Sequence, residues 1–165
     1  MWVFVGLRGP TVFHGETSIN LDAKGRLAIP TRYRDAISES SSDQLILTIN
    51  PFDTNHNLWL YPLPEWERVQ RQVMALSTSN ETHRWVQRFL VGSAARCDLD
   101  SAGRILIPGP QREFAGLSKK IALLGLGHRF ELWDDATWNA LRNQQLEGGL
   151  ESGGQASMEL DGLSL

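Results

Sequence analysis

The chain has 165 residues with 16 Lys or Arg and 19 Asp or Glu, which gives a net charge of −3. This balance lacks the strongly basic character of many nucleic-acid-binding domains, so any contact with nucleic acid must depend on local charge. One cysteine excludes an internal disulfide, and no segment approaches the roughly 20 apolar residues of a membrane-spanning helix, so we expect no membrane partner.

The first clear pattern is a hairpin around Leu21-Asp22-Ala23-Lys24-Gly25-Arg26-Leu27-Ala28-Ile29-Pro30. An Asp and an Arg bracket three residues, and the third is a Gly that can adopt the positive φ of a three-residue hairpin loop. We predict strands over residues 17–21 and 26–29, with Asp22 opposite Arg26. The same register sets Leu21 against Leu27 and Ile19 against Ile29 on one apolar face.

Further elements follow this hairpin. We predict a short helix over 31–38, strands over 44–49 and 58–61, and a helix from Pro64 to about Leu76. A second helix is expected over 81–91, with apolar positions at Trp85, Val86, Phe89 and Leu90. The two helices are expected to space the halves of the chain.

The hairpin pattern recurs 78 positions later as Leu99-Asp100-Ser101-Ala102-Gly103-Arg104-Ile105-Leu106-Ile107-Pro108. An internal repeat of this kind indicates two similar modules. The same register predicts a hairpin over 95–107 in which Leu99 meets Ile105 and Cys97 meets Ile107. A helix over 111–115, strands over 120–124 and 129–133 joined by a turn at 125–127, and a helix over 135–146 complete the pattern, before an acidic, Gly-rich tail that we expect to be disordered.

These residues resemble those of the MraZ family, bacterial regulators built from two AbrB-like (SpoVT-AbrB) modules. The resemblance rests on two Asp-x-x-x-Arg hairpins that each run into an Ile-Pro step, with Tyr61-Pro62-Leu63-Pro64-Glu65-Trp66 after the first and Glu131-Leu132-Trp133-Asp134 after the second. It covers roughly residues 12–147. It implies a mainly β, α+β fold in which two swapped-hairpin modules form a pseudo-symmetric β-barrel unit, with a helix after each module.

The resulting domain division is a first module over 15–63, a helical connector over 64–92, a second module over 94–137, the end of a C-terminal helix over 138–147 and the tail over 148–165. Residues 1–11 fit no pattern. Because Val12-Phe13-His14-Gly15 resembles the start of MraZ chains, we interpret residues 1–11 as an extension that is an annotation artefact if translation begins at Val12. The intact mass of the native protein would test this.

The candidate DNA-binding residues are the cations at and near the two turns: Lys24, Arg26, Arg32 and Arg104. Asp22, Gly25, Asp100 and Gly103 are expected to position the loops. Arginine offers a rigid fork of donors and lysine a mobile charge, which suits base edges and phosphates. The segment 20–34 holds four basic residues and 98–112 only two, so the first module is expected to contribute more.

The resemblance implies a sequence-specific repressor that binds double-stranded DNA at repeated elements in its own promoter, upstream of the division and cell-wall gene cluster. It also implies a homo-oligomeric ring, in the cytoplasm and on the nucleoid. Several modules in one oligomer would multiply weak contacts through effective concentration. We expect no cofactor, no metal and no small-molecule substrate.

Two other classes of function compete with DNA binding. Two repeated aspartates are typical of aspartic proteases, but each Asp here has an Arg four positions on, which would keep it ionised and prevent proton sharing. An AbrB-like antitoxin or a structural interaction protein is the alternative to a promoter-binding regulator. The six tryptophans could stack on single-stranded nucleic acid, but their positions favour packing, and Cys97 is expected in the core.

Overall fold

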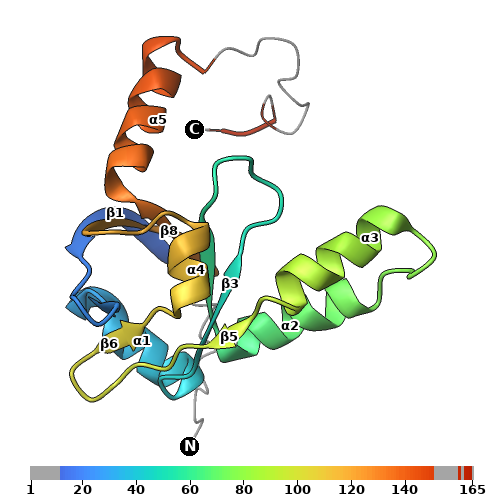
Figure 1. The fold of residues 1–165 in the computed structure, drawn as a ribbon, viewed down its shortest axis with the longest axis horizontal. Coiled ribbons are helices and arrows are strands. Elements are labelled where there is room, and N and C mark those ends of the chain that lie inside the picture. The colour runs from blue at the N-terminus through green and yellow to red at the C-terminus, as the bar shows by residue number, and fades with distance from the viewer. Residues whose placement is uncertain (1–11, 151–159, 161, 165) are drawn as a thin grey trace, which may run out of the picture. The chain divides into compact units, whose positions relative to one another are not determined.

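The structure is a computed structural model that describes residues 12–150, 160 and 162–164. The predictions for residues 1–11 and for most of the tail lie outside the described residues. In chain order the elements are β1 (Phe13–Asn20), β2 (Arg26–Ala28), α1 (Thr31–Ser41), β3 (Leu45–Ile49), β4 (Leu58–Pro62), α2 (Leu63–Met74), α3 (Glu81–Val86), the π-helical turn η1 (Gln87–Val91), β5 (Ala95–Arg96), β6 (Arg104–Leu106), α4 (Gly109–Phe114), β7 (Lys120–Gly127), β8 (Arg129–Asp134) and α5 (Asp135–Glu147) (Figure 1).

The chain divides into two compact units, one ending at Asp135 and the other beginning at Ala136. All the strands named here lie in the first unit. No helix among the described residues is long and apolar enough to cross a membrane.

The strand order is the same when the two halves of the chain are exchanged. Six strands form one antiparallel sheet in the order β1-β7-β8-β4-β3-β5, and β2 pairs with β6 in a second sheet. Replacing β1, β3 and β4 by β5, β7 and β8, and the reverse, gives the same order read backwards. The predicted α+β class and pseudo-symmetric, swapped pairing are confirmed, whereas closure into a barrel and the module bounds 15–63 and 94–137 stay predictions.

The first hairpin is paired as predicted only close to its turn. Leu21 forms a bridge with Leu27, but Ile19 pairs with Ile121 of β7, and the N–H of Ile29 donates to the carbonyl of Gly103 at 2.9 Å. The predicted Ile19–Ile29 pair is therefore wrong. Beyond the turn, each strand continues alongside a strand of the other half of the chain.

The second hairpin shows the same departure from the predicted pairing. β5 pairs with β3, and the N–H groups of Cys97 and Leu99 donate to the carbonyls of Leu45 and Asp43, each at 2.9 Å. The predicted Cys97–Ile107 pair is thus wrong, because β6 pairs with β2 and the N–H of Ile107 donates to the carbonyl of Gly25 at 2.9 Å. At the turn itself the pairing is as predicted, since the N–H of Asp100 donates to the carbonyl of Arg104 at 2.8 Å. The Cys97 thiol still lies beside this strand, with Sγ 3.3 Å from the carbonyl oxygen of Leu106.

The main core is built from both halves of the chain. Leu27 and Ile29 of the first half and Ile105 and Ile107 of the second are fully buried in one cluster. Such a shared core lets two small modules bury apolar surface that neither could bury alone. Cys97 lies in this core as predicted, and burial raises the pKa of its thiol to about 12, which makes it a poor nucleophile.

The helical pair packs on the outer face of the six-stranded sheet, where α2 lies beside η1 and α3 (Figure 1). Trp66 of α2 and Leu90 of η1 are buried there against the strands. Trp85 and Phe89, predicted as apolar positions of the same helix, are instead 46% and 42% exposed and stack on each other. The helix therefore faces the sheet with Val86 and Leu90, and not with Trp85 and Phe89.

The turn predicted at 125–127 begins later than expected. Gly125 lies inside β7, opposite Gly15 of β1, and a Cβ atom at Gly125 would come 2.7 Å from the backbone nitrogen of His14. The glycine therefore allows the two strands to approach closely. Gly127, with a φ of +75°, begins the turn.

Candidate nucleic-acid interface

The first turn is held together by the Asp22 carboxylate. Its Oδ1 accepts hydrogen bonds from the backbone N–H of Lys24 at 2.9 Å and of Arg26 at 2.8 Å, and Oδ2 accepts one from Arg26 Nε at 2.8 Å. The N–H of Gly25 donates to the Asp22 carbonyl at 3.0 Å, with Gly25 at a φ of +82°. These bonds leave the Lys24 side chain exposed at the tip.

The second turn repeats this geometry. Asp100 Oδ1 accepts from the backbone N–H of Ala102 and of Arg104, both at 2.9 Å, and Oδ2 accepts from Arg104 Nε at 3.2 Å. Gly103 has a φ of +74°. Each aspartate is thus bound to donors of its own turn, which is the arrangement of a structural carboxylate and not of an acid pair that shares one proton.

The pKa values of both carboxyl groups lie below the usual range. For Asp22 the largest cause is the backbone N–H of Arg26, with the Arg26 side chain and the Lys24 N–H adding to it. For Asp100 the largest cause is the backbone N–H of Arg104. Hydrogen bonds to the ionised carboxylate favour it over the protonated form.

A pH dependence follows from this shift. Because the folded pKa of Asp22 is below its unfolded value of about 4, the stabilisation is complete above that value and is lost as the pH falls through the folded pKa. We expect wild type to be more stable than Asp22→Asn at pH 7, and the difference in unfolding free energy to shrink below about pH 4. Urea unfolding of both proteins between pH 7 and 3 checks this; a constant difference would contradict it.

The two arginines of the turns lie on one outward face of the ribbon formed by β2 and β6. The opposite residues are Arg26 with Leu106, Leu27 with Ile105, and Ala28 with Arg104. Leu27 and Ile105 are fully buried, so the alternation of side chains directs the other two pairs away from the core. The side chains of Arg26 and Arg104 are 30% and 37% exposed, and Leu106 is 56% exposed on the same face.

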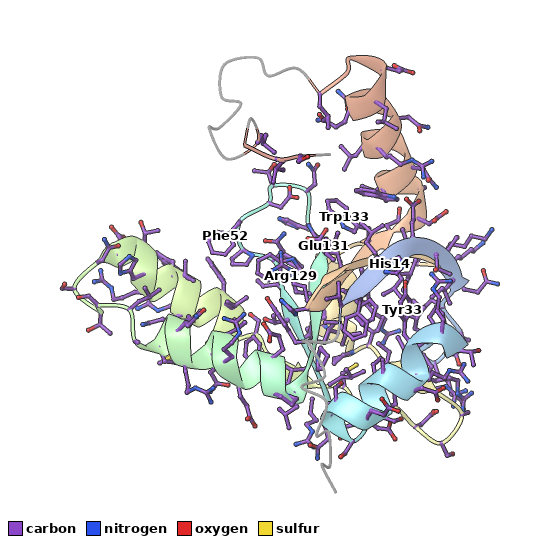
Figure 2. All side chains as sticks on the ribbon, turned by 180° about the vertical axis from the view of Figure 1, so that it is seen from behind. His14, Tyr33, Phe52, Arg129, Glu131 and Trp133 are labelled. Atoms are coloured by element: carbon purple, nitrogen blue, oxygen red, sulfur yellow. The ribbon has the colours of Figure 1, made fainter. Side chains whose placement is uncertain are left out.

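Arg32, the fourth predicted contact residue, lies on α1. Its Nη2 donates to the Tyr33 hydroxyl at 3.1 Å and to Thr17 Oγ1 of β1, and its guanidinium lies 4.6 Å from the centre of the Tyr33 ring. The Tyr33 hydroxyl in turn donates to the carbonyl of His14 (Figure 2). The structure therefore groups Arg32, which is exposed, with the edge of β1, whereas Lys24, Arg26 and Arg104 belong to the turns and ribbon.

The tryptophans of the six-stranded sheet are packed rather than available for stacking on bases. Trp59 and Trp133 are 8% and 4% exposed, and Glu131 accepts a hydrogen bond from each indole Nε1 at 3.0 Å. The guanidinium of Arg129 lies 4.0 Å from the centre of the Trp59 ring. Figure 2 shows Arg129, Glu131 and Trp133 together on β8. The prediction that these tryptophans pack within the protein is confirmed.

Comparison with known proteins decides the family. A family model described as "MraZ protein, putative antitoxin-like" matches residues 12–89 and 90–156 in tandem. The chain belongs to the MraZ family. The two matched segments each contain one of the two turns, so the family match and the internal repeat describe the same division of the chain.

Curated relatives agree with this membership of the MraZ family. Proteins named transcriptional regulator MraZ from Klebsiella pneumoniae (strain 342), Yersinia pestis (strain Pestoides F) and Escherichia coli O127:H6 are 45%, 44% and 43% identical over 155, 154 and 155 residues. Each comparison covers 93% of this chain and 100% of the relative. Membership places the chain in a family of transcriptional regulators, which is not a class of enzymes.

Two arginines outside the predicted candidate site contact the turns of this MraZ chain. Arg34 of α1 lies against Gly103, and Arg112 of α4 lies against Gly25. Both arginines come four residues after the Pro that follows a hairpin, and the repeat spacing of 78 relates them. Extending the repeat past Pro30 and Pro108 would have found them.

Proposed function

We propose that this chain is a repressor that binds double-stranded DNA sequence-specifically through Lys24, Arg26 and Arg104, with Arg32 at the side. The observation that carries the proposal is the ribbon of β2 and β6, which places Arg26 and Arg104 on one outward face. A two-stranded antiparallel ribbon fits the width of the major groove. Asp22, Gly25, Asp100 and Gly103 hold the turns at the two ends of this ribbon.

The chemistry of the face suits base edges and phosphates. Arginine can donate two hydrogen bonds to guanine, and an apolar side chain such as exposed Leu106 can contact a thymine methyl group. Lys24, exposed at the tip of the first turn, suits a phosphate. The second turn has Ala102 at the position that matches Lys24, so the first module is expected to contribute the larger share of the binding free energy.

A homo-oligomeric ring is part of the proposal. With a net charge of −3, a single chain offers DNA only a few cations, and each phosphate contact adds little on its own. Joining several ribbons in one ring that binds repeated elements raises the effective concentration of each. As the resemblance implies, these elements lie in the chain's own promoter, upstream of the division and cell-wall gene cluster, and the protein acts in the cytoplasm on the nucleoid without a cofactor.

A mobility-shift titration tests the proposal. The DNA is the region upstream of the chain's own gene, with a shuffled duplex of equal length and composition as the control, at salt concentrations from about 50 to 200 mM. We expect tighter binding to the upstream DNA and an affinity that falls with salt by close to one unit of log–log slope per phosphate contact. Equal binding to both duplexes would contradict sequence specificity, and no binding would favour the antitoxin or structural alternative.

A further inference from the structure

Each turn of the proposed DNA-binding face is covered by an arginine from the other half of the chain. A Cβ atom placed on Gly103 would lie 2.3 Å from Arg34 Nε and 2.7 Å from its Cδ. A Cβ atom on Gly25 would lie 2.7 Å from both Cζ and Nη1 of Arg112. Each arginine side chain therefore occupies the space that the glycine of the opposite turn leaves open.

Backbone hydrogen bonds join the same pairs of segments. The N–H of Ile29, five residues before Arg34, donates to the Gly103 carbonyl at 2.9 Å, and the N–H of Ile107, five residues before Arg112, donates to the Gly25 carbonyl at 2.9 Å. Each turn glycine is thus held at its carbonyl by one segment of the other half and covered at its Cα by an arginine of that half. The position of each turn in the fold therefore depends on contacts with the other half of the chain.

We propose that Arg34 and Arg112 are positioning residues for DNA binding, each acting on the turn of the opposite half. Arg112 sets the turn that carries Lys24 and Arg26, and Arg34 sets the turn that carries Arg104. The expected effect on DNA binding rests on the proposed function. The contacts of Arg34 with Gly103 and of Arg112 with Gly25 are observed in the structure.

The two arginines differ in what else holds them. Arg34 Nε donates to the carbonyl of Ile29 at 2.7 Å, so removing this side chain takes away a hydrogen bond. Arg112 Nε is buried and has no hydrogen-bond partner among the described residues, so removing it deletes a buried donor that is not satisfied. Loss of a satisfied bond destabilises a fold more than loss of an unsatisfied donor.

The turns that they cover also differ. The turn under Arg112 carries the two cations Lys24 and Arg26, whereas the turn under Arg34 carries Arg104 alone. If each arginine positions the turn of the other half, the effects on binding and on stability rank the two variants differently. Arg112→Ala has the larger effect on DNA binding, and Arg34→Ala has the larger effect on stability.

The experiment compares Arg34→Ala and Arg112→Ala with the control Arg96→Ala. Arg96 is an exposed arginine whose Nε lies 3.0 Å from Asp98, and it is not among the nearest neighbours of Gly25 or Gly103. Affinity for the upstream DNA, well below the melting temperature, is measured beside thermal unfolding. We expect about tenfold weaker binding and little change in Tm for Arg112→Ala, and about threefold weaker binding with a larger fall in Tm for Arg34→Ala. Binding losses that follow the losses in Tm would overturn the proposal.

Salt dependence separates positioning from a direct phosphate contact. A residue that touches a phosphate reduces the salt slope by about one when it is removed, whereas we expect the slope of Arg112→Ala to equal that of wild type. We also expect Arg112→Lys to leave binding weakened, because it restores the charge but not the planar group that covers Gly25. A reduced slope with rescue by lysine would make Arg112 a phosphate contact and overturn the positioning role.

Hydrogen exchange tests the crossed contacts without DNA. The backbone N–H groups of Lys24 and Arg26, both bound to Asp22, are expected to exchange severalfold faster in Arg112→Ala and to be unchanged in Arg34→Ala. Unchanged exchange at these groups in Arg112→Ala would refute the positioning role, whatever the DNA-binding results of wild type and variants are. Failure of wild type to bind the upstream DNA, with exchange altered as expected, would instead count against the proposed function.

Discussion

Replacing Arg26 by alanine is expected to weaken binding to the upstream DNA by about 10- to 100-fold, because a bidentate arginine–guanine contact discriminates by roughly 1–3 kcal/mol. The residue sits on the outward face of the ribbon, opposite Leu106, with its Nε on Asp22. Its remaining guanidinium donors are the groups proposed to meet a base. The titration described for wild type, repeated with the variant, measures the effect.

Loss of the ion pair with Asp22 is the competing explanation, and two controls address it. Arg96→Ala also removes an exposed arginine whose Nε lies 3.0 Å from an aspartate, and such surface pairs contribute about 0–1 kcal/mol. We expect it to bind normally. Arg26→Lys keeps the charge but loses the fork of donors, and we expect its binding to stay weak. Light scattering checks that each variant assembles, and normal binding by an assembled Arg26→Ala protein would refute the assignment.

The second large effect concerns stability, and we expect Gly103→Ala to lose about 2–3 kcal/mol of unfolding free energy. A side chain at a φ of +74° costs about 1–2 kcal/mol in backbone strain. The new Cβ would lie 2.3 Å from Arg34 Nε, so the arginine must move away from the Ile29 carbonyl that it binds at 2.7 Å. The lost hydrogen bond adds about 1 kcal/mol.

Gly127→Ala is the matched control for this variant. Its φ of +75° imposes the same backbone strain, but a Cβ atom at this position would have no neighbour within 4 Å in the part of the chain that the structure describes. We therefore expect a loss of only about 1–2 kcal/mol. Urea unfolding of both variants isolates the contribution of the arginine contact. Equal losses would show that Arg34 yields to the new methyl group at no cost.

The parts of the fold that residue spacing predicted correctly are those fixed by neighbours in the sequence, whereas the swapped pairing of the two halves was implied only by the resemblance to the MraZ family. The spacing of Asp22, Gly25 and Arg26 was sufficient to predict the turn, because its hydrogen bonds all run between residues at most four positions apart. The repeat 78 residues later extended the same prediction to Asp100 and Arg104. Burial of Cys97 also followed from its place in the apolar alternation.

The parts that were predicted wrongly depend on contacts between distant segments. The alternation of apolar residues correctly indicated which face of β1 is buried, but it did not specify the partner strand, since Ile121 satisfies Ile19 as well as Ile29 would. The exposed stack of Trp85 and Phe89 was missed because both rows of the helix looked apolar. Arg34 and Arg112 were left out of the candidate site because their significance depends on glycines in the opposite half.

The palindromic strand order makes the halves of the chain complementary pieces rather than independent domains. A chain cut between η1 and β5 would leave β1 without β7, and β2 without β6. Neither fragment alone can pair all of its strands. Together, the two separately expressed fragments supply every strand pair of the fold, so we expect them to reassemble by fragment complementation, as split reporters do.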